Sequence, residues 1–139
     1  MKYIFLFILI HISLIVSGQS ITGTWDTYDD KTKEKKATIE IYETDSTYYG
    51  KIIKSYSGKE NSICEKCKGT KKDKPIIGLV IIEDIKKDDD EYNGGTILDP
   101  ESGKTYSCYL ELTDVNTLKV RGFLGFSLLG RTQYWQRKN

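Results

Sequence analysis

Histidine is almost missing from this chain of 139 residues, in which His11 is the only one. His11 lies within an N-terminal apolar run, residues 3–16, so it is lost if that run is removed. The rest of the chain then has no imidazole, the side chain that most often serves as a base near neutral pH. This absence excludes Ser-His-Asp and Cys-His catalysis and metal sites built from histidine. No catalytic residue is therefore assigned.

A surplus of either charge is also missing, because 21 Lys and Arg residues stand against 20 Asp and Glu residues. The two signs are interspersed along the chain. Without a basic stripe, the sequence gives no electrostatic basis for binding nucleic acid or an anionic membrane surface. We therefore expect no nucleic-acid partner.

Long apolar runs are confined to the N-terminus. Lys2 precedes the apolar residues 3–16, and the small residues Ser17 and Gly18 follow them. This order predicts a secretory signal peptide over residues 1–18. The run is shorter than the roughly 20 residues that a membrane-spanning helix needs. We expect an exported protein, periplasmic or extracellular, whose residues 19–139 form one domain that does not stay inserted in the membrane.

Helical periodicity is absent after residue 18, whereas apolar residues recur at every second position. The odd positions of residues 37–42 are apolar, and the even positions of residues 106–112 form a second apolar face. Residues 118–126 repeat this alternation. Residues 76–82 form a nearly continuous apolar run rich in β-branched side chains, which predicts a buried strand.

Polar turns separate these segments, and residues 57–74 form the one long connection. Counting the segments gives about eight strands joined in up-and-down order. Short strands with regular turns predict an all-β fold, an antiparallel barrel or sandwich. An eight-stranded barrel has an interior that is either filled by side chains or just wide enough for one small ligand. The sequence leaves both outcomes open.

The segment Gly23-Thr24-Trp25 resembles the Gly-x-Trp entry of lipocalin-type barrels. The resemblance implies that Trp25 closes one barrel end and that an arginine from the last strand, Arg131 or Arg137, packs across it. An arginine over an indole contributes about 0.5–2 kcal/mol, whereas replacing a buried tryptophan by alanine costs about 3–5 kcal/mol. We therefore expect these three residues to be structural.

The three cysteines are candidates for a disulfide in an oxidising compartment. Chain entropy gives about 2 kcal/mol for a Cys64–Cys67 link and about 4 kcal/mol for a Cys67–Cys108 link. Cys108 lies on the apolar face of its predicted strand, so it also fits a buried thiol. A Cys-x-x-Cys redox site belongs where a strand meets a helix, which an all-β chain does not offer. Three thiolates without histidine make a poor zinc site, so no metal and no cofactor are expected.

The chain contains, in this order, Gly23-Thr24-Trp25, Cys64-Glu65-Lys66-Cys67 and Gly103-Lys104-Thr105-Tyr106-Ser107-Cys108, with further short segments between and after them. This ordered set is similar to an exported bacterial family catalogued as domain of unknown function 2147. The resemblance covers nearly all of the mature chain. It implies a lipocalin-like barrel and an envelope location, and it carries over no activity. The matching segments are Gly23-Thr24-Trp25, Tyr49-Gly50-Lys51-Ile52, Cys64-Glu65-Lys66-Cys67, Asp73-Lys74-Pro75-Ile76-Ile77-Gly78, Gly94-Gly95-Thr96-Ile97-Leu98-Asp99-Pro100, Gly103-Lys104-Thr105-Tyr106-Ser107-Cys108, Val120-Arg121-Gly122-Phe123-Leu124-Gly125 and Gly130-Arg131-Thr132-Gln133-Tyr134-Trp135.

Three hypotheses about function follow. The first is a non-catalytic protein that binds a small apolar or amphipathic ligand in the barrel interior, through Tyr49, Tyr106, Phe126 and Trp135. The second is a structural or protein-interaction module of the envelope, with a filled barrel and contacts made by the lysine-rich residues 59–74. The third is a thiol-disulfide redox protein that uses Cys64 and Cys67. The sequence ranks them in this order.

Overall fold

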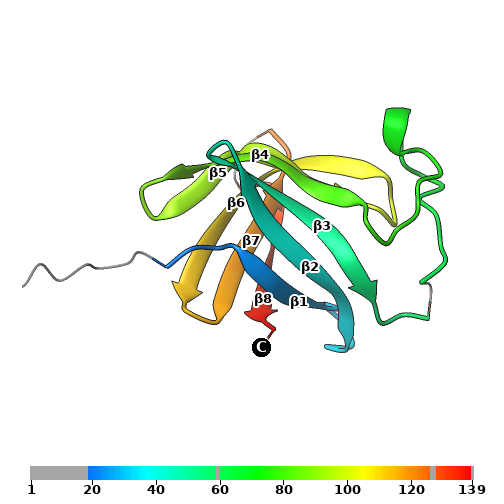
Figure 1. Cartoon of the computed structure of the whole chain (residues 1–139), viewed down its shortest axis with the longest axis horizontal. Coiled ribbons are helices and arrows are strands. Elements are labelled where there is room, and N and C mark those ends of the chain that lie inside the picture. Colours follow the sequence, from blue (N-terminus) through cyan, green and yellow to red (C-terminus); the bar gives the residue numbers. More distant parts are fainter. Residues whose placement is uncertain (1–18, 59, 126–127, 139) are drawn as a thin grey trace, which may run out of the picture.

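The computed structural model describes residues 19–58, 60–125 and 128–138. Eight antiparallel strands form a closed barrel in which each strand pairs with the next and β8 returns to β1 (Figure 1). The expected all-β, up-and-down, lipocalin-like barrel is thus confirmed. The elements are β1 (Gly23–Tyr28), β2 (Lys35–Thr44), β3 (Thr47–Ser55), η1 (Gly69–Lys71), β4 (Val80–Asp88), β5 (Glu91–Asp99), β6 (Lys104–Asp114), β7 (Thr117–Phe123) and β8 (Gly130–Arg137). Within the described residues, no helix is long and apolar enough to cross a membrane.

The register of the strands decides which side chains face the interior. Trp25 of β1 lies opposite Ile39 of β2, and Ile39 lies opposite Ile52 of β3. On the other side of the barrel, Leu118 of β7 lies opposite Trp135 of β8. All five side chains are buried. The apolar positions of the alternating segments therefore meet in one core, as their period of two predicts.

The two ends of the barrel differ in their connections. At one end, two-residue turns join β2 to β3 at Asp45-Ser46, β4 to β5 at Asp89-Asp90 and β6 to β7 at Val115-Asn116. We call this the closed end, because the segment that precedes β1 also crosses it. At the other end lie the connections 29–34, 56–79, 100–103 and 124–129, and we call this end the mouth. Longer connections at one end of a rigid scaffold are the usual place for binding.

Residues 76–82 do not form the single strand that their composition predicts. Gly78 has a φ of +92°, its N–H donates to the carbonyl of Ile52 at 2.7 Å, and β4 begins only at Val80. The prediction for residues 118–126 was also too long, because β7 ends at Phe123. A glycine at positive φ turns the chain before it joins the sheet.

The long connection 56–79 covers the outer face of β4 and β5. Ile81 and Leu98 point outward, because their neighbours Ile82 and Ile97 lie opposite one another on the inner face. Ile81 and Leu98 are nevertheless buried, together with Cys64 and Leu79, which belong to the connection. The apolar sequence of β4 thus serves two cores, one inside the barrel and one outside it under the connection.

A candidate binding site at the mouth of the barrel

Trp25 and Arg137 close one end of the barrel. The indole of Trp25 is 0% exposed, and its Nε1 donates to the carbonyl of Ile21 at 2.9 Å. The guanidinium carbon of Arg137 lies 4.3 Å from the centre of the Trp25 ring. Its nitrogens donate to the carbonyl oxygens of Thr22, Ser20 and Val115 at 2.9, 3.1 and 2.9 Å. Arg137 therefore ties the segment before β1 and the β6–β7 turn together over the indole.

Arg131, the other arginine considered for this role, lies at the opposite end of β8. It forms an ion pair with Asp30 in the connection between β1 and β2. It does not cover the indole, because the register of β8 against β1 sets Arg137 and not Arg131 opposite Trp25. Arg131 instead links the start of β8 to the β1–β2 connection at the mouth.

The half of the interior next to the closed end is filled by side chains. Tyr48 and Tyr92 meet edge to face with 5.0 Å between ring centres, and burial raises the pKa of Tyr48 to about 12. Leu110, Leu118 and Trp135 pack within the same core. The burial of these large side chains stabilises the barrel, so we assign this half of the interior a structural role.

Four inward-facing residues nearer the mouth are covered less completely than their neighbours. Ile97 lies opposite Tyr106, and Val120 lies opposite Gln133. Ile97, Tyr106, Gly122 and Gln133 are only half-buried. A Cβ atom added to Gly122 would lie 3.4 Å from Ile97 and 3.5 Å from Tyr106, at ordinary contact distance. These four inward-facing residues offer apolar surface and one amide near the mouth, and we call the group the mouth cup.

The residues predicted to contact a ligand fall in different places. Tyr106 is a wall of the mouth cup. Trp135 is buried beneath the cup, where its Nε1 donates to Oε1 of Gln133 at 3.1 Å. Tyr49 faces outward and stacks on Tyr42 with 5.7 Å between ring centres, because its neighbour Tyr48 occupies the inner face. Phe126 lies outside the described residues.

A second opening lies beside the cup, where the barrel closes on itself. β1 and β8 pair only at Trp25–Arg137 and Asp26–Gln136, both toward the closed end. Nearer the mouth, a hollow of about 290 Å³ lies between the two strands, and Gln133 is part of its wall. Gln133 also donates to Oδ1 of Asp30 at 3.4 Å. The lining residues are Tyr28, Asp29, Asp30, Lys33, Thr132, Gln133 and Tyr134.

The cysteines resolve into one disulfide and one thiol. Cys64 is linked to Cys67, and both are almost fully buried under the long connection. Cys108 faces the barrel interior, and burial raises the pKa of its thiol to about 12. A Cys67–Cys108 link does not form, because the barrel wall separates the two residues. Among the described residues, no three His, Cys, Asp or Glu side chains are grouped so that they could hold a metal ion.

Comparison with known proteins agrees with the architecture. No curated protein matches the chain in sequence. The solved structure of protein HP1028 from the human pathogen Helicobacter pylori, described as belonging to the lipocalin family, is similar with a TM-score of 0.77 and 18% identity, over 88% of this chain and 85% of that one. At this identity the likeness shows the fold alone. A family model described as an uncharacterized protein conserved in bacteria, DUF2147, matches residues 23–137, and the chain belongs to that family.

Proposed function

We propose that the protein is an exported, non-catalytic binding protein that holds a small apolar or amphipathic ligand in the mouth cup. The observation that carries the proposal is the apolar surface left open at the mouth cup. Tyr48, Leu110 and Leu118 are buried, whereas Ile97 and Tyr106 leave apolar surface half-open to water. Covering such surface contributes about 25 cal/mol per Å². A cup at the open end of a barrel is also a usual place for a small ligand.

Gln133 supplies the polar part of the cup. Its Oε1 accepts from the buried indole of Trp135, and its Nε2 reaches the Asp30 carboxylate at the rim. The amide is held from both sides, so it presents a fixed orientation to a ligand. One fixed polar group among apolar walls selects an amphipathic molecule with a single polar end.

Gly122 provides the test, because a side chain there would contact both Ile97 and Tyr106. Gly122→Leu is expected to cover the surface of these two residues and to weaken binding of the neutral apolar probe N-phenyl-1-naphthylamine about 10-fold, equivalent to about 1.4 kcal/mol. The measurement is a fluorescence titration of the purified protein from residue 19 onward. Ser107→Leu, exposed on the outer face of β6, is the matched control and should bind as the unaltered protein does. Equal affinities in all three proteins would count against the cup.

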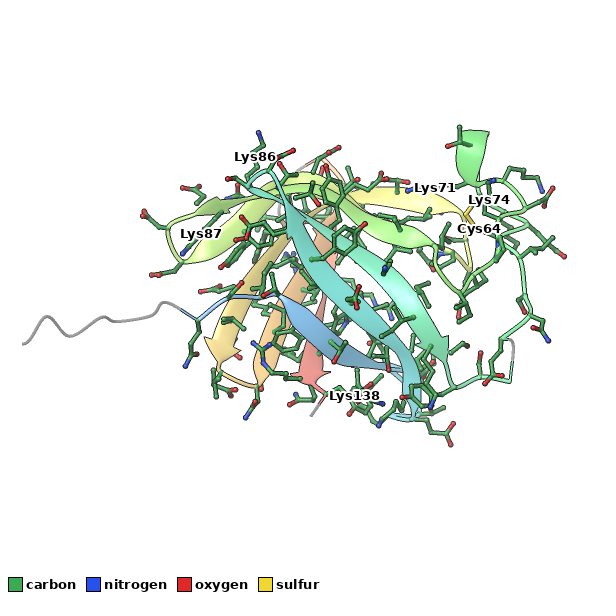
Figure 2. The ribbon with its side chains drawn as sticks, viewed as in Figure 1. Cys64, Lys71, Lys74, Lys86, Lys87 and Lys138 are labelled. Atoms are coloured by element: carbon green, nitrogen blue, oxygen red, sulfur yellow. A yellow bond between two sulfur atoms is a disulfide. The ribbon has the colours of Figure 1, made fainter. Side chains whose placement is uncertain are left out.

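The long connection supports a second candidate function, that of an interaction module in the envelope. Residues 64–74 contain five lysines against Glu65 and Asp73. The connection projects from the barrel beyond β3 and β4, with Lys71, Lys74 and Cys64 within it (Figure 2). Changing Lys66, Lys68 and Lys74 together to glutamine should abolish specific crosslinks formed in host cells. The same change at Lys86 and Lys87, on the barrel itself, should leave them intact.

Export to the periplasm or the medium is part of the proposal. It is supported by the Cys64–Cys67 disulfide, since structural disulfides persist mainly in oxidising compartments. Mass spectrometry of the protein from fractionated host cells should find a chain that begins at Gln19. Finding the protein in the cytoplasm with residues 1–18 retained would contradict export. The ligand-binding part of the proposal does not depend on this result.

A further inference from the structure

A cluster of three lysines surrounds one tyrosine on the outer wall of the barrel, away from the mouth cup. Tyr56 follows β3, and its hydroxyl accepts a hydrogen bond from Nζ of Lys138 at 2.8 Å. The ammonium groups of Lys35, Lys54 and Lys138 lie 5.3, 4.8 and 5.5 Å from the centre of the Tyr56 ring. Figure 2 shows Lys138 at the end of β8. The three lysines therefore come from β2, β3 and the C-terminal segment.

One carboxylate balances part of this charge. Asp26 is 8% exposed in its side chain; its Oδ1 accepts from the hydroxyl of Thr38 at 2.7 Å, and its Oδ2 pairs with Lys35 at 3.3 Å. Thr38 also lies 3.1 Å from the Tyr56 hydroxyl. Within the described residues, no carboxylate comes within ion-pair distance of Lys54 or Lys138. The cluster thus retains two positive charges on a fixed base, and charges of one sign that are held together attract an ion of the other sign.

A hollow whose lining includes Lys54 and Lys138 lies beside the cluster. It measures about 330 Å³ and is lined by Thr24, Thr38, Ile53, Lys54 and Lys138. Ile53 is 37% exposed there, which gives the hollow one apolar side. We call it the lysine hollow. Its lining combines two cations with an apolar surface, while the hydroxyl groups of Thr24 and Thr38 donate to the carbonyl oxygen of Lys138 and to Asp26.

We infer that the lysine hollow binds an organic oxyanion, whose charged oxygens lie between Lys54 and Lys138 and whose apolar part lies against Ile53. Tyr56 fixes Lys138 through the hydrogen bond to its hydroxyl, and Asp26 fixes Thr38. The site is separate from the mouth cup, so it does not depend on the proposed function. An ammonium group acts as a point charge toward an oxyanion, so the hollow selects for charge and for an apolar substituent.

The protonation of the cluster supports this inference. The hydrogen bond from Lys138 holds the pKa of Tyr56 below its usual value of 10.0. The same bond holds the pKa of Lys138 above its usual value of 10.5. The raised pKa keeps Lys138 as a charged ammonium, the form that pairs with an oxyanion.

The test uses phenyl phosphate, which combines an oxyanion with an apolar ring. In an NMR titration of the isotope-labelled protein, phenyl phosphate should shift the amides of Thr38, Lys54 and Tyr56 saturably, and inorganic phosphate should bind more weakly. The double variant Lys54→Met/Lys138→Met should lose at least 10-fold in affinity for phenyl phosphate. Lys86→Met/Lys87→Met, which removes the same charge elsewhere on the barrel, is the matched control.

Three results would overturn the inference. They are an affinity that is unchanged in Lys54→Met/Lys138→Met, an equal response to neutral phenol, and an equal affinity for inorganic phosphate. Vesicles of phosphatidylglycerol separate two sources of the ligand. Retention on vesicles that the double variant abolishes assigns a lipid headgroup, whereas binding of phenyl phosphate without retention assigns a free molecule. The double variant should bind N-phenyl-1-naphthylamine with unchanged affinity. Loss of phenyl phosphate binding and loss of N-phenyl-1-naphthylamine binding therefore test the lysine hollow and the mouth cup separately.

Discussion

Arg137 and Arg131 show how the position of a residue decides its energetic value. Arg137 donates to three backbone carbonyls and covers the buried Trp25. Arg131 pairs with a single carboxylate, and its side chain is 63% exposed. Both lie on β8 and both face inward, yet the first closes the barrel and the second lies in solvent at the mouth.

This difference predicts unequal effects of the same conservative change. Arg137→Lys should lower the free energy of unfolding by about 1–3 kcal/mol, because one ammonium group cannot reach carbonyls in three directions and leaves acceptors unsatisfied. Arg131→Lys should cost less than about 1 kcal/mol, since exposed ion pairs contribute little. Urea denaturation at pH 7 measures both. Equal losses of stability in the two variants would mean that the three hydrogen bonds of the Arg137 guanidinium do not stabilise the closed end.

Tyr48 links the packing of the closed half to pH. Its pKa is raised to about 12 by burial, so the folded state favours the neutral phenol. The stabilisation is fully present below pH 10, the pKa of an unfolded tyrosine, and is lost as the pH rises toward 12. Stability should therefore fall across this window by up to about 1.4 kcal/mol per pH unit for this group. The Cys108 thiol, with a pKa raised to about 12, acts in the same direction.

The variant Tyr48→Phe isolates the contribution of the hydroxyl. It keeps the ring that packs against Tyr92 and removes the group that titrates. Thermal unfolding followed from pH 9 to pH 12 should show a shallower loss of stability in the variant than in the unaltered protein. Parallel curves would mean that Tyr48 ionises without cost in the folded state.

At the scale of elements, the long connection is held by one disulfide and a few backbone hydrogen bonds. The N–H of Cys64 donates to the carbonyl of Lys74, and the N–H of Asp73 donates to the carbonyl of Cys64. The connection covers Ile81 and Leu98 on the outer face of the sheet. Loss of the link should therefore disturb this covering and leave the interior of the barrel in place.

The double variant Cys64→Ser/Cys67→Ser tests this separation. It should lower the stability of the connection by about 2 kcal/mol, the entropy of a short closed loop. Hydrogen exchange should quicken at residues 62–78 and stay unchanged at β7 and β8. Cys108→Ala, inside the barrel, is the control and should not affect exchange in the connection. Uniformly faster exchange would show that the disulfide supports the whole domain.

Strands that are covered on one face were predictable from sequence, and β4 was not. β2 and β6 alternate strictly, so Ile39, Ile41, Cys108 and Leu110 all lie on the inner face. β4 is covered on both faces at its start, where Ile81 packs outside and Ile82 inside. A run that is apolar on both faces has no alternation to reveal its register.

The mouth cup was only partly predictable, because register between distant strands decides it. Tyr106 was identified by its own alternation, whereas Ile97, Gly122 and Gln133 become its neighbours through the pairing of β5 to β8. Tyr48 and Tyr49 are adjacent aromatic residues that local composition does not distinguish. A one-residue shift exchanges the two faces of a strand, and the shift is set by tertiary structure.

At the scale of the whole molecule, the barrel is closed at one end and leaves the mouth cup part-exposed at the other, and the pairing of β1 with β8 differs between the same two ends. β7 and β8 pair along all of Thr117–Phe123, whereas β1 and β8 pair at two positions near the closed end. Toward the mouth, the hollow lined by Tyr28 and Gln133 takes the place of further pairing. The seam between β1 and β8 is therefore the part of the wall with the least backbone hydrogen bonding.

This division predicts how the molecule opens. Backbone amides at positions that pair in a full ladder exchange only on global unfolding, whereas poorly paired strands exchange through local openings. Exchange followed by NMR should thus be slow at Leu110 and Leu118 and much faster at Tyr28 and at those amides of residues 132–134 that point toward β1 and not toward β7. Because Gln133 belongs to both the seam and the mouth cup, a saturating apolar ligand should slow exchange at the seam and leave Leu110 unchanged. Seam amides as protected as those of Leu110 in the free protein would mean that the barrel closes fully, and a ligand would then have to enter through the mouth alone.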